Sequence, residues 1–171
     1  MAEIVKFGKA FNEPRQNQKG TILFPPRNNQ SITVRFVGVQ QRLYSTWDSS
    51  ARAFNFYESK REKAVQRIVS FVVDRSDEKV KAFLCPVTVF NKMGEYDITH
   101  DFSINRYGQG LNTKYEVESL GESSVSEEIE NKVAITSETY SLVDIFVNKV
   151  KWSLLDVKIE PITDRFDILD L

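Results

Sequence analysis

The sequence predicts a mainly-β protein, and three observations lead to that prediction. Short runs of alternating apolar and polar residues, rich in β-branched side chains, recur between residues 31 and 117, and such runs are typical of half-buried strands. Turn-forming residues separate these runs. The chain of 171 residues is 41% hydrophobic and 27% charged, which is ordinary for one globular domain or a core domain with an appendix.

The first predicted strand covers residues 31–39. It follows the loop-forming run PPRNN at residues 25–29, so we expect residues 1–30 to form a basic arm that leads into the fold. Residues 42–63 lose the alternation and interleave rings with cations. That stretch is predicted to be a loop-like connection to the next strand.

A hairpin follows that connection. Residues 68–73 restore the strand pattern, residues 74–77 have turn chemistry, and residues 79–85 form the returning strand. These are the second and third predicted strands.

A short helix is predicted directly after the third strand. Pro86 suits its first position, and Val89, Phe90 and Met93 are spaced to bury one side. Gly94 is expected to end it.

Two more strands complete the predicted core. They cover residues 102–106 and 113–117, with a tight turn at residues 108–110 between them. Five strands with a helix between the third and fourth are the element order of an OB fold, a five-stranded β-barrel.

The last fifty residues have a different character. Ser124 and Glu127 have capping-box spacing ahead of an acidic helix. A second helical run is predicted at residues 141–154, where Val143, Val147, Val150 and Leu154 share one stripe. We therefore divide the chain into an arm (1–30), a core (31–120) and a helical, acidic extension (121–171).

Charge is distributed unevenly along the chain, although the net charge is only -1. Residues 1–68 carry twelve basic side chains against five acidic ones, and residues 115–171 carry five against thirteen. Such asymmetry indicates a face that binds a polyanion and, at the other end, an acidic segment. The alternative is that both are solvated faces of one domain.

Aromatic residues are numerous, with 12 Phe, 6 Tyr and 2 Trp, and many of them stand among cations in residues 42–67. Single-stranded nucleic acid binds to such mixtures, because each base offers a face for stacking and each nucleotide carries one negative charge. The alternative is that some rings, Phe54 or Phe56 above all, close the end of the barrel. A second mixture of rings and cations lies at residues 104–115, around Gly108 and Gly110. The alternative interpretation of this stretch is an ordinary hairpin.

These two stretches supply the candidate binding residues. The candidates for base stacking are Tyr44, Trp47, Phe54, Tyr57, Tyr107 and Tyr115. The candidates for phosphate contacts are Arg42, Arg52, Lys60, Arg61, Lys63, Arg67, Arg106 and Lys114.

Residues 97–117, DITHDFSINRYGQGLNTKYEV, resemble a segment of the tailed-bacteriophage single-stranded DNA-binding proteins. In that family an acidic turn leads into a strand, followed by a Gly-x-Gly-Leu-x-Thr-x-Tyr-x-Val-like turn and strand. Residues 71–75, 79–86 and 89–90 are similar to the preceding hairpin and short helix of the family. The resemblance covers residues 31–120.

The resemblance implies an OB-fold protein, not an enzyme, that coats DNA strands exposed during phage replication, recombination and repair. Some members hold zinc, but the single Cys85 and single His100 are too few ligands for such a site, so no cofactor is expected. The family often ends in an acidic tail that recruits replication enzymes. A similar ending makes five residues candidates for binding replication or recombination proteins: Asp167, Ile168, Leu169, Asp170 and Leu171. The alternative is a final strand or helix cap that folds onto the domain.

Other functional classes remain open. A virion structural or assembly protein would use the helix at residues 141–154 as its oligomer contact, and a metal-dependent nuclease would use Glu95, Asp97 and Asp101. An RNA-binding OB fold is a closer variant. No signal peptide or membrane span is apparent in the sequence, so we expect no membrane partner and a location in the cytoplasm of the host cell.

Overall fold

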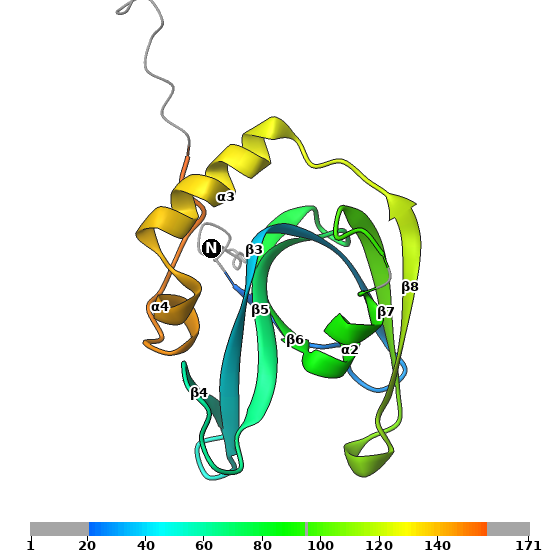
Figure 1. Ribbon diagram of the computed structural model, residues 1–171, viewed down its shortest axis with the longest axis vertical. Helices are drawn as coiled ribbons and strands as arrows, with labels where there is room; N and C mark the ends of the chain where they lie inside the picture. Colours follow the sequence, from blue (N-terminus) through cyan, green and yellow to red (C-terminus); the bar gives the residue numbers. More distant parts are fainter. Residues whose placement is uncertain (1–20, 95, 157–171) are drawn as a thin grey trace, which may run out of the picture.

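A computed structural model describes residues 21–94 and 96–156, which form one curved sheet with helices on both of its faces (Figure 1). The strands are β2 (Ile22–Leu23), β3 (Ser31–Asp48), β4 (Ala53–Tyr57), β5 (Val65–Asp74), β6 (Lys79–Pro86), β7 (His100–Tyr107) and β8 (Lys114–Glu122). The helices are α2 (Val87–Lys92), the 3-10 turn η1 (Gly110–Asn112), α3 (Glu127–Thr139) and α4 (Leu142–Phe146).

The sheet confirms the mainly-β prediction. Its strands follow the order β2-β6-β5-β3-β7-β8, and β4 pairs with β3 outside this path. The five predicted strands correspond to β3, β5, β6, β7 and β8, with α2 between β6 and β7 as expected. The pairing is antiparallel, except that β2 runs parallel to β6.

The prediction of a closed five-stranded barrel is wrong. The sheet has seven strands, and in the described part of the chain no pairing joins β6 to β8. Instead β2, which belongs to the predicted arm, pairs with β6 through Ile22 and Leu23 and extends that edge of the sheet. The sheet is therefore curved but open.

Strand β3 is much longer than predicted, and the prediction of a loop over residues 42–63 is wrong. The strand bends at Gly38, which has φ +82°, and its register with β5 shifts between Val37 and Gln41. Beyond this bulge it continues to Asp48 and returns as β4. The sequence does not alternate visibly between apolar and polar residues here, because the polar Ser45 occupies a buried position while the aromatic Tyr44 is partly exposed on the opposite face.

Both faces of the sheet are covered. On one face, Leu43, Phe71 and Leu84 pack in a core that includes residues of α4 and the buried Trp152. On the other face, inside the curve, Phe36 packs in a second core that includes Val89 of α2. This explains the nearly continuous apolar run of β5, because its residues alternate between two buried faces.

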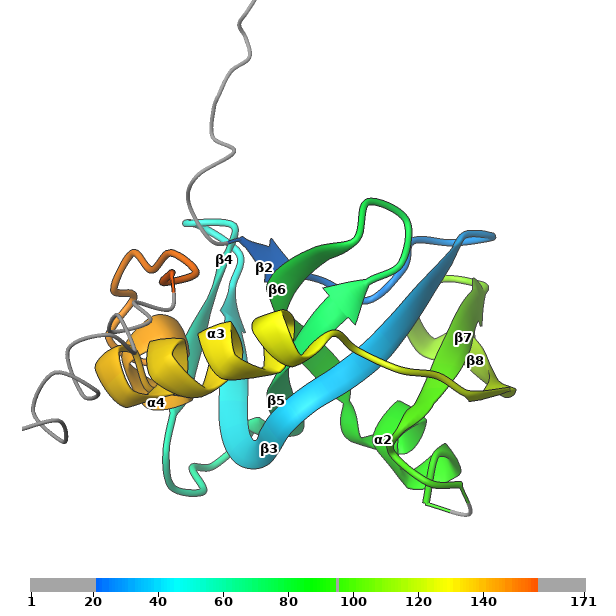
Figure 2. The ribbon, with the colours of Figure 1, turned by 90° about the horizontal axis from the view of Figure 1, so that it is seen from above.

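The extension begins with α3, whose true cap lies two residues beyond the predicted one. The Ser126 hydroxyl accepts a hydrogen bond from the Ile129 N–H at 3.1 Å, as expected for an N-cap serine. Figure 2 shows α3 lying across β3 and β5, with α4 beyond its end.

The predicted helix over residues 141–154 is wrong, because α4 ends at Phe146. Lys149 has a left-handed φ of +55°, which ends helical geometry. The chain beyond it places Trp152 against Phe71, with ring centroids 5.1 Å apart. Burial of this large ring overrides the local helical pattern. In the described residues, no helix has the length and apolar character needed to cross a membrane.

Candidate nucleic-acid interface

A groove of about 750 Å³ lies between the β3–β4 hairpin and the paired strands β7 and β8. Both hairpins point the same way, downward in Figure 1. Among the described residues, five rings line the groove: Phe24, Trp47, Phe54, Phe56 and Tyr115. Five cations are also among these described lining residues: Arg27, Arg52, Arg67, Arg106 and Lys149. None of the described residues that line it is acidic, so its charge is strongly positive.

The register of the β3–β4 hairpin places three of its aromatic side chains on the face that lines the groove. Trp47 lies opposite Phe54 across the pair, and Ser45 lies opposite Phe56, so Trp47, Phe54 and Phe56 share one face. The Trp47 and Phe54 rings meet edge to face at 4.9 Å. Trp47 is 55% exposed, which leaves a ring face available for a base.

Phe24 extends this row of rings from the other side of the groove. Its ring lies 6.4 Å from Phe54 at an interplanar angle of 22°, and it is 50% exposed. The sequence pattern does not assign Phe24 to the site, because the loop-forming run at residues 25–29 favours an arm over residues 1–30. The signal was present, since Phe24 and Arg27 repeat the mixture of rings and cations found downstream.

Arg67 is fixed at the base of the hairpin. Its Nε donates to the Ser45 hydroxyl at 3.1 Å, and its guanidinium lies 5.5 Å from the Phe54 ring centroid. Burial lowers the pKa of Arg67 below its ordinary value, yet a guanidinium stays charged at neutral pH. A cation held in partial burial is poorly hydrated and suited to a phosphate.

Arg106 lies at the opposite wall, across the β7–β8 pair from Tyr115. Its two terminal nitrogens donate to the Pro26 carbonyl and to the Thr113 hydroxyl, each at 3.3 Å. Its Nε is buried without a partner in the described part of the molecule. Arg106 therefore holds the chain before β3 against the β7–β8 turn.

The tight turn expected around Gly108 depends on glycine. Gly108 has φ +86°, and a Cβ there would lie 2.2 Å from the Asn112 carbonyl oxygen. Gly110 also has a left-handed φ, of +57°, but a Cβ on it would meet open space. Of these two glycines in the turn, Gly108 is the one that close packing requires.

Lys149 brings the extension into the groove, which the sequence did not suggest. Its Nζ donates to the Phe54 carbonyl at 2.7 Å and lies 6.0 Å from the Phe56 ring centroid. It comes from the segment that was predicted to be helical.

Six of the predicted residues line the groove: Trp47, Phe54, Tyr115, Arg52, Arg67 and Arg106. Tyr44 and Tyr57 lie opposite each other on the other face of the hairpin, where Arg61 stacks 4.0 Å over the Tyr57 ring. The remaining six are exposed to solvent or partly so and are not among the lining residues of the groove: Arg42, Lys60, Lys63, Tyr107, Lys114 and Arg61.

The candidate nuclease residues have structural partners. Asp101 accepts from Arg75 Nε at 3.1 Å and from the Ser123 hydroxyl at 2.7 Å, and Asp97 accepts from the Thr99 N–H at 3.0 Å. Glu95 lies outside the described residues. Among residues 21–94 and 96–156, no three His, Cys, Asp or Glu side chains are grouped to hold a metal ion.

Two further residues have structural surroundings. Cys85 is buried, and this burial raises the pKa of its thiol well above the ordinary value. His100 Nδ1 lies 2.7 Å from the Ser119 hydroxyl. The candidate partner-binding residues 167–171 lie outside the described residues.

Comparison with known proteins does not extend these observations. No family model, curated protein or solved structure matches the chain. The resemblance to the phage single-stranded DNA-binding proteins therefore stays a prediction.

Proposed function

We propose that the protein binds single-stranded DNA, without catalysing a reaction, and coats strands exposed during phage DNA replication, recombination and repair. The observation that carries this proposal is the groove, whose described lining combines five rings with five cations and no carboxylate. Rings bind bases in any sequence, and cations follow the sugar-phosphate backbone. We propose residues 167–171 as the contact for replication or recombination proteins.

The magnitudes support a binding role. Stacking contributes about 1–3 kcal/mol per base. Each phosphate neutralised on a single strand adds about 0.7 to the slope of log affinity against log salt. A strand that stacks on two of the exposed rings would thus gain about 2–6 kcal/mol from stacking. Contacts with three of the cations would give a salt slope of about 2. A duplex would bind less well, because its base faces are already stacked.

The proposal extends to an OB-type core. In the order β3, β5, β6, β7, β8, the groove lies between the connection of the first two strands and that of the last two. Those connections are elements that OB folds use to bind oligonucleotides, and OB barrels are partly open. The additional strands β2 and β4 would then be elaborations of that core.

The competing classes have less support. The assembly-protein hypothesis required a contact helix over residues 141–154, whereas α4 spans Leu142–Phe146. The nuclease hypothesis required a carboxylate cluster, whereas Asp101 is engaged by Arg75 and Ser123. RNA remains the closest alternative ligand, and competition between DNA and RNA oligomers of one sequence separates the two through contacts to the 2′-hydroxyl.

Tryptophan fluorescence tests the proposal directly. Trp47 is 55% exposed and Trp152 only 4% exposed, so Trp47 should report a stacked base. Titration with an unstructured DNA oligomer is expected to give saturable quenching that weakens with salt and is small for a duplex. The Trp47→Phe variant should lose most of the quenching. Absence of binding at low salt would overturn the proposal.

A further inference from the structure

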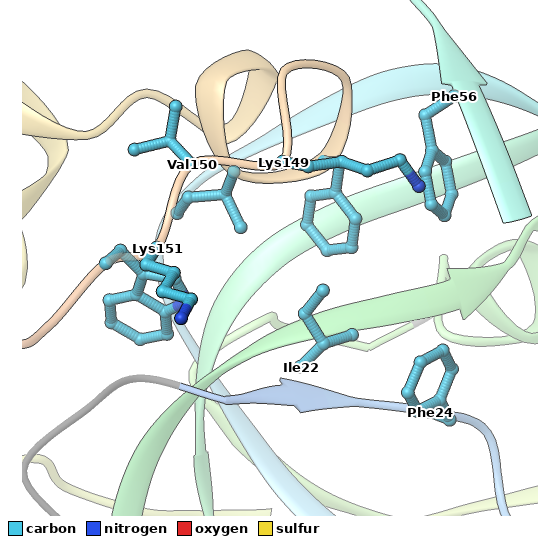
Figure 3. Close-up of a pocket in the computed structure, with 9 residues that line it drawn as sticks. Ile22, Phe24, Phe56, Lys149, Val150 and Lys151 are labelled. Atoms are coloured by element: carbon cyan, nitrogen blue, oxygen red, sulfur yellow. The ribbon is translucent and has the colours of Figure 1, made fainter. Parts of the chain in front are cut away.

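A second cavity of about 480 Å³ lies beside the groove and is drawn in Figure 3. It shares Ile22, Phe24, Phe56 and Lys149 with the groove. In the figure, Ile22 lies on β2 and Phe24 directly after it, and Phe56 stands beside the extended Lys149 side chain. We call this cavity the side pocket. A strand in the groove could reach it past Phe24 and Lys149.

The walls of the side pocket are mainly apolar and partly aromatic. Besides the shared residues, Phe146 and Trp152 line it and are almost fully buried, whereas Val150 at its rim is 41% exposed. Its volume lies within the range of about 300–1,000 Å³ of sites for small ligands. A flat, apolar group of the size of a nucleobase fits these walls.

The rim of the side pocket is positive. Lys149 and Lys151 both line it, and none of its described lining residues is acidic. Flat apolar walls below two ammonium groups are complementary to one nucleotide, whose base is aromatic and whose phosphate is anionic. Continuity with the groove identifies its source as the bound strand.

We propose that the side pocket takes one base of the strand bound in the groove, with Lys151 contacting the adjacent phosphate. This inference rests on the proposed function and adds a terminal subsite to it. The strand would then pass from the β7–β8 wall, along the rings of the hairpin, to the segment after α4. Residues of the extension would take part in binding together with the sheet.

A length series of oligothymidylates, from about 4 to 16 nucleotides, tests the side pocket in the full-length protein. The variants Val150→Glu and Lys151→Gln change its rim. Matched controls are Val39→Glu, at a site that is 77% exposed, and Lys79→Gln, at another exposed site. Thermal melting of each variant confirms that the fold is retained.

The expected result depends on oligomer length. Val150→Glu should leave the affinity of the shortest oligomers unchanged and weaken that of longer ones about tenfold, the value of one stacked base. Lys151→Gln should lower the salt slope for long oligomers by about 0.7. An abasic site moved along the oligomer should weaken wild-type binding at one terminal position, and this loss should be absent in Val150→Glu.

The outcomes separate the two proposals. If Trp47→Ala weakens binding while both rim variants match the wild type at every length, the side pocket is not a nucleotide subsite and the groove proposal stands. Equal weakening at every length also overturns the terminal subsite. If the wild type binds no oligomer, both proposals fail.

Discussion

The ammonium of Lys149 donates to the carbonyl oxygen of Phe54 at 2.7 Å. This bond joins the segment after α4 to the strand that carries the rings of the groove. Lys149 adopts a left-handed φ of +55° to make it, a conformation that costs a residue other than glycine about 1 kcal/mol. The extension thus helps to position the hairpin as well as covering the sheet.

Replacing Lys149 should affect both stability and binding. Lys149→Ala removes the hydrogen bond to Phe54 and one of the cations that line the groove. We expect the free energy of unfolding to fall by about 1 kcal/mol and the salt slope to fall by about 0.7. Urea denaturation and fluorescence titration measure the two effects. Lys79→Ala, at an exposed site remote from the groove, should change neither.

The two faces of the β3–β4 hairpin should differ in their effect on DNA affinity. Trp47→Ala removes a half-exposed ring from the groove and should weaken binding about tenfold or more, with a thermal midpoint close to that of the wild type. Tyr57→Ala changes the opposite face, where Arg61 stacks on the ring, and should weaken binding much less. Equal losses would show that the strand contacts both faces.

Cations of the groove should determine the salt dependence. Arg27→Gln combined with Arg52→Gln is expected to lower the salt slope by about 1.4, because two phosphate contacts are lost. Lys60, Arg61 and Lys63 are not among the lining residues of the groove. Their triple replacement by Gln should therefore lower the salt slope by less than the Arg27 and Arg52 double variant does. Titrations at four or more salt concentrations give both slopes. A larger change in the triple variant would move the backbone path to the other face of the hairpin.

Gly108 and Gly110 should respond differently to alanine. At Gly108 the new Cβ would lie 2.2 Å from a backbone oxygen, so the β7–β8 turn must shift and we expect a loss of about 2 kcal/mol or more in the free energy of unfolding. At Gly110 the space is open, and the cost should be about 1 kcal/mol from the left-handed φ alone. Thermal and urea denaturation of both variants test the difference.

Stability at acid pH should depend on Asp74. Burial raises the pKa of Asp74, but hydrogen bonds from Lys81 and Ser76 outweigh it and bring the pKa below its ordinary value of 3.8. Because the folded pKa is depressed, the stabilisation is present above about pH 4 and is lost as the pH falls through the folded pKa. Asp74→Asn should therefore lower the urea midpoint at pH 6 and narrow the difference between pH 6 and pH 3. An unchanged difference would assign the acid sensitivity to other carboxylates.

The sequence predicted those parts of the fold in which local pattern and tertiary packing agree. The strand around Phe102 alternates between buried and partly buried positions as a half-buried strand should, and Val89 lies on the buried side of α2 as expected. The local sequence pattern predicted the wrong structure where tertiary contacts determine the conformation, as in the helix expected over residues 141–154. Trp152 packs on Phe71 instead of continuing a helix.

The candidate site was only partly predictable, for a related reason. Trp47, Phe54 and Arg67 stood out as rings and cations close together in the sequence. Phe24 and Lys149 reach the same groove from distant segments, through the pairing of β2 with β6 and the bond to the Phe54 carbonyl. Periodicity within one segment carries no information about such long-range contacts. The same periodicity could not show that Tyr57 lies on the face of β4 that points away from the groove, because residues 42–63 were predicted to be a loop.

The burial of Trp152 against Phe71 also bears on the synthesis of the protein. The chain emerges from the ribosome with its N-terminal part first, so the sheet face that contains Leu43, Phe71 and Leu84 is made well before α4 and Trp152, which share its core. Until those residues follow, α3 alone can cover part of that apolar face, and the groove has no Lys149. A nascent chain or a fragment that stops before α4 would therefore both aggregate more readily and hold DNA more weakly than the finished protein.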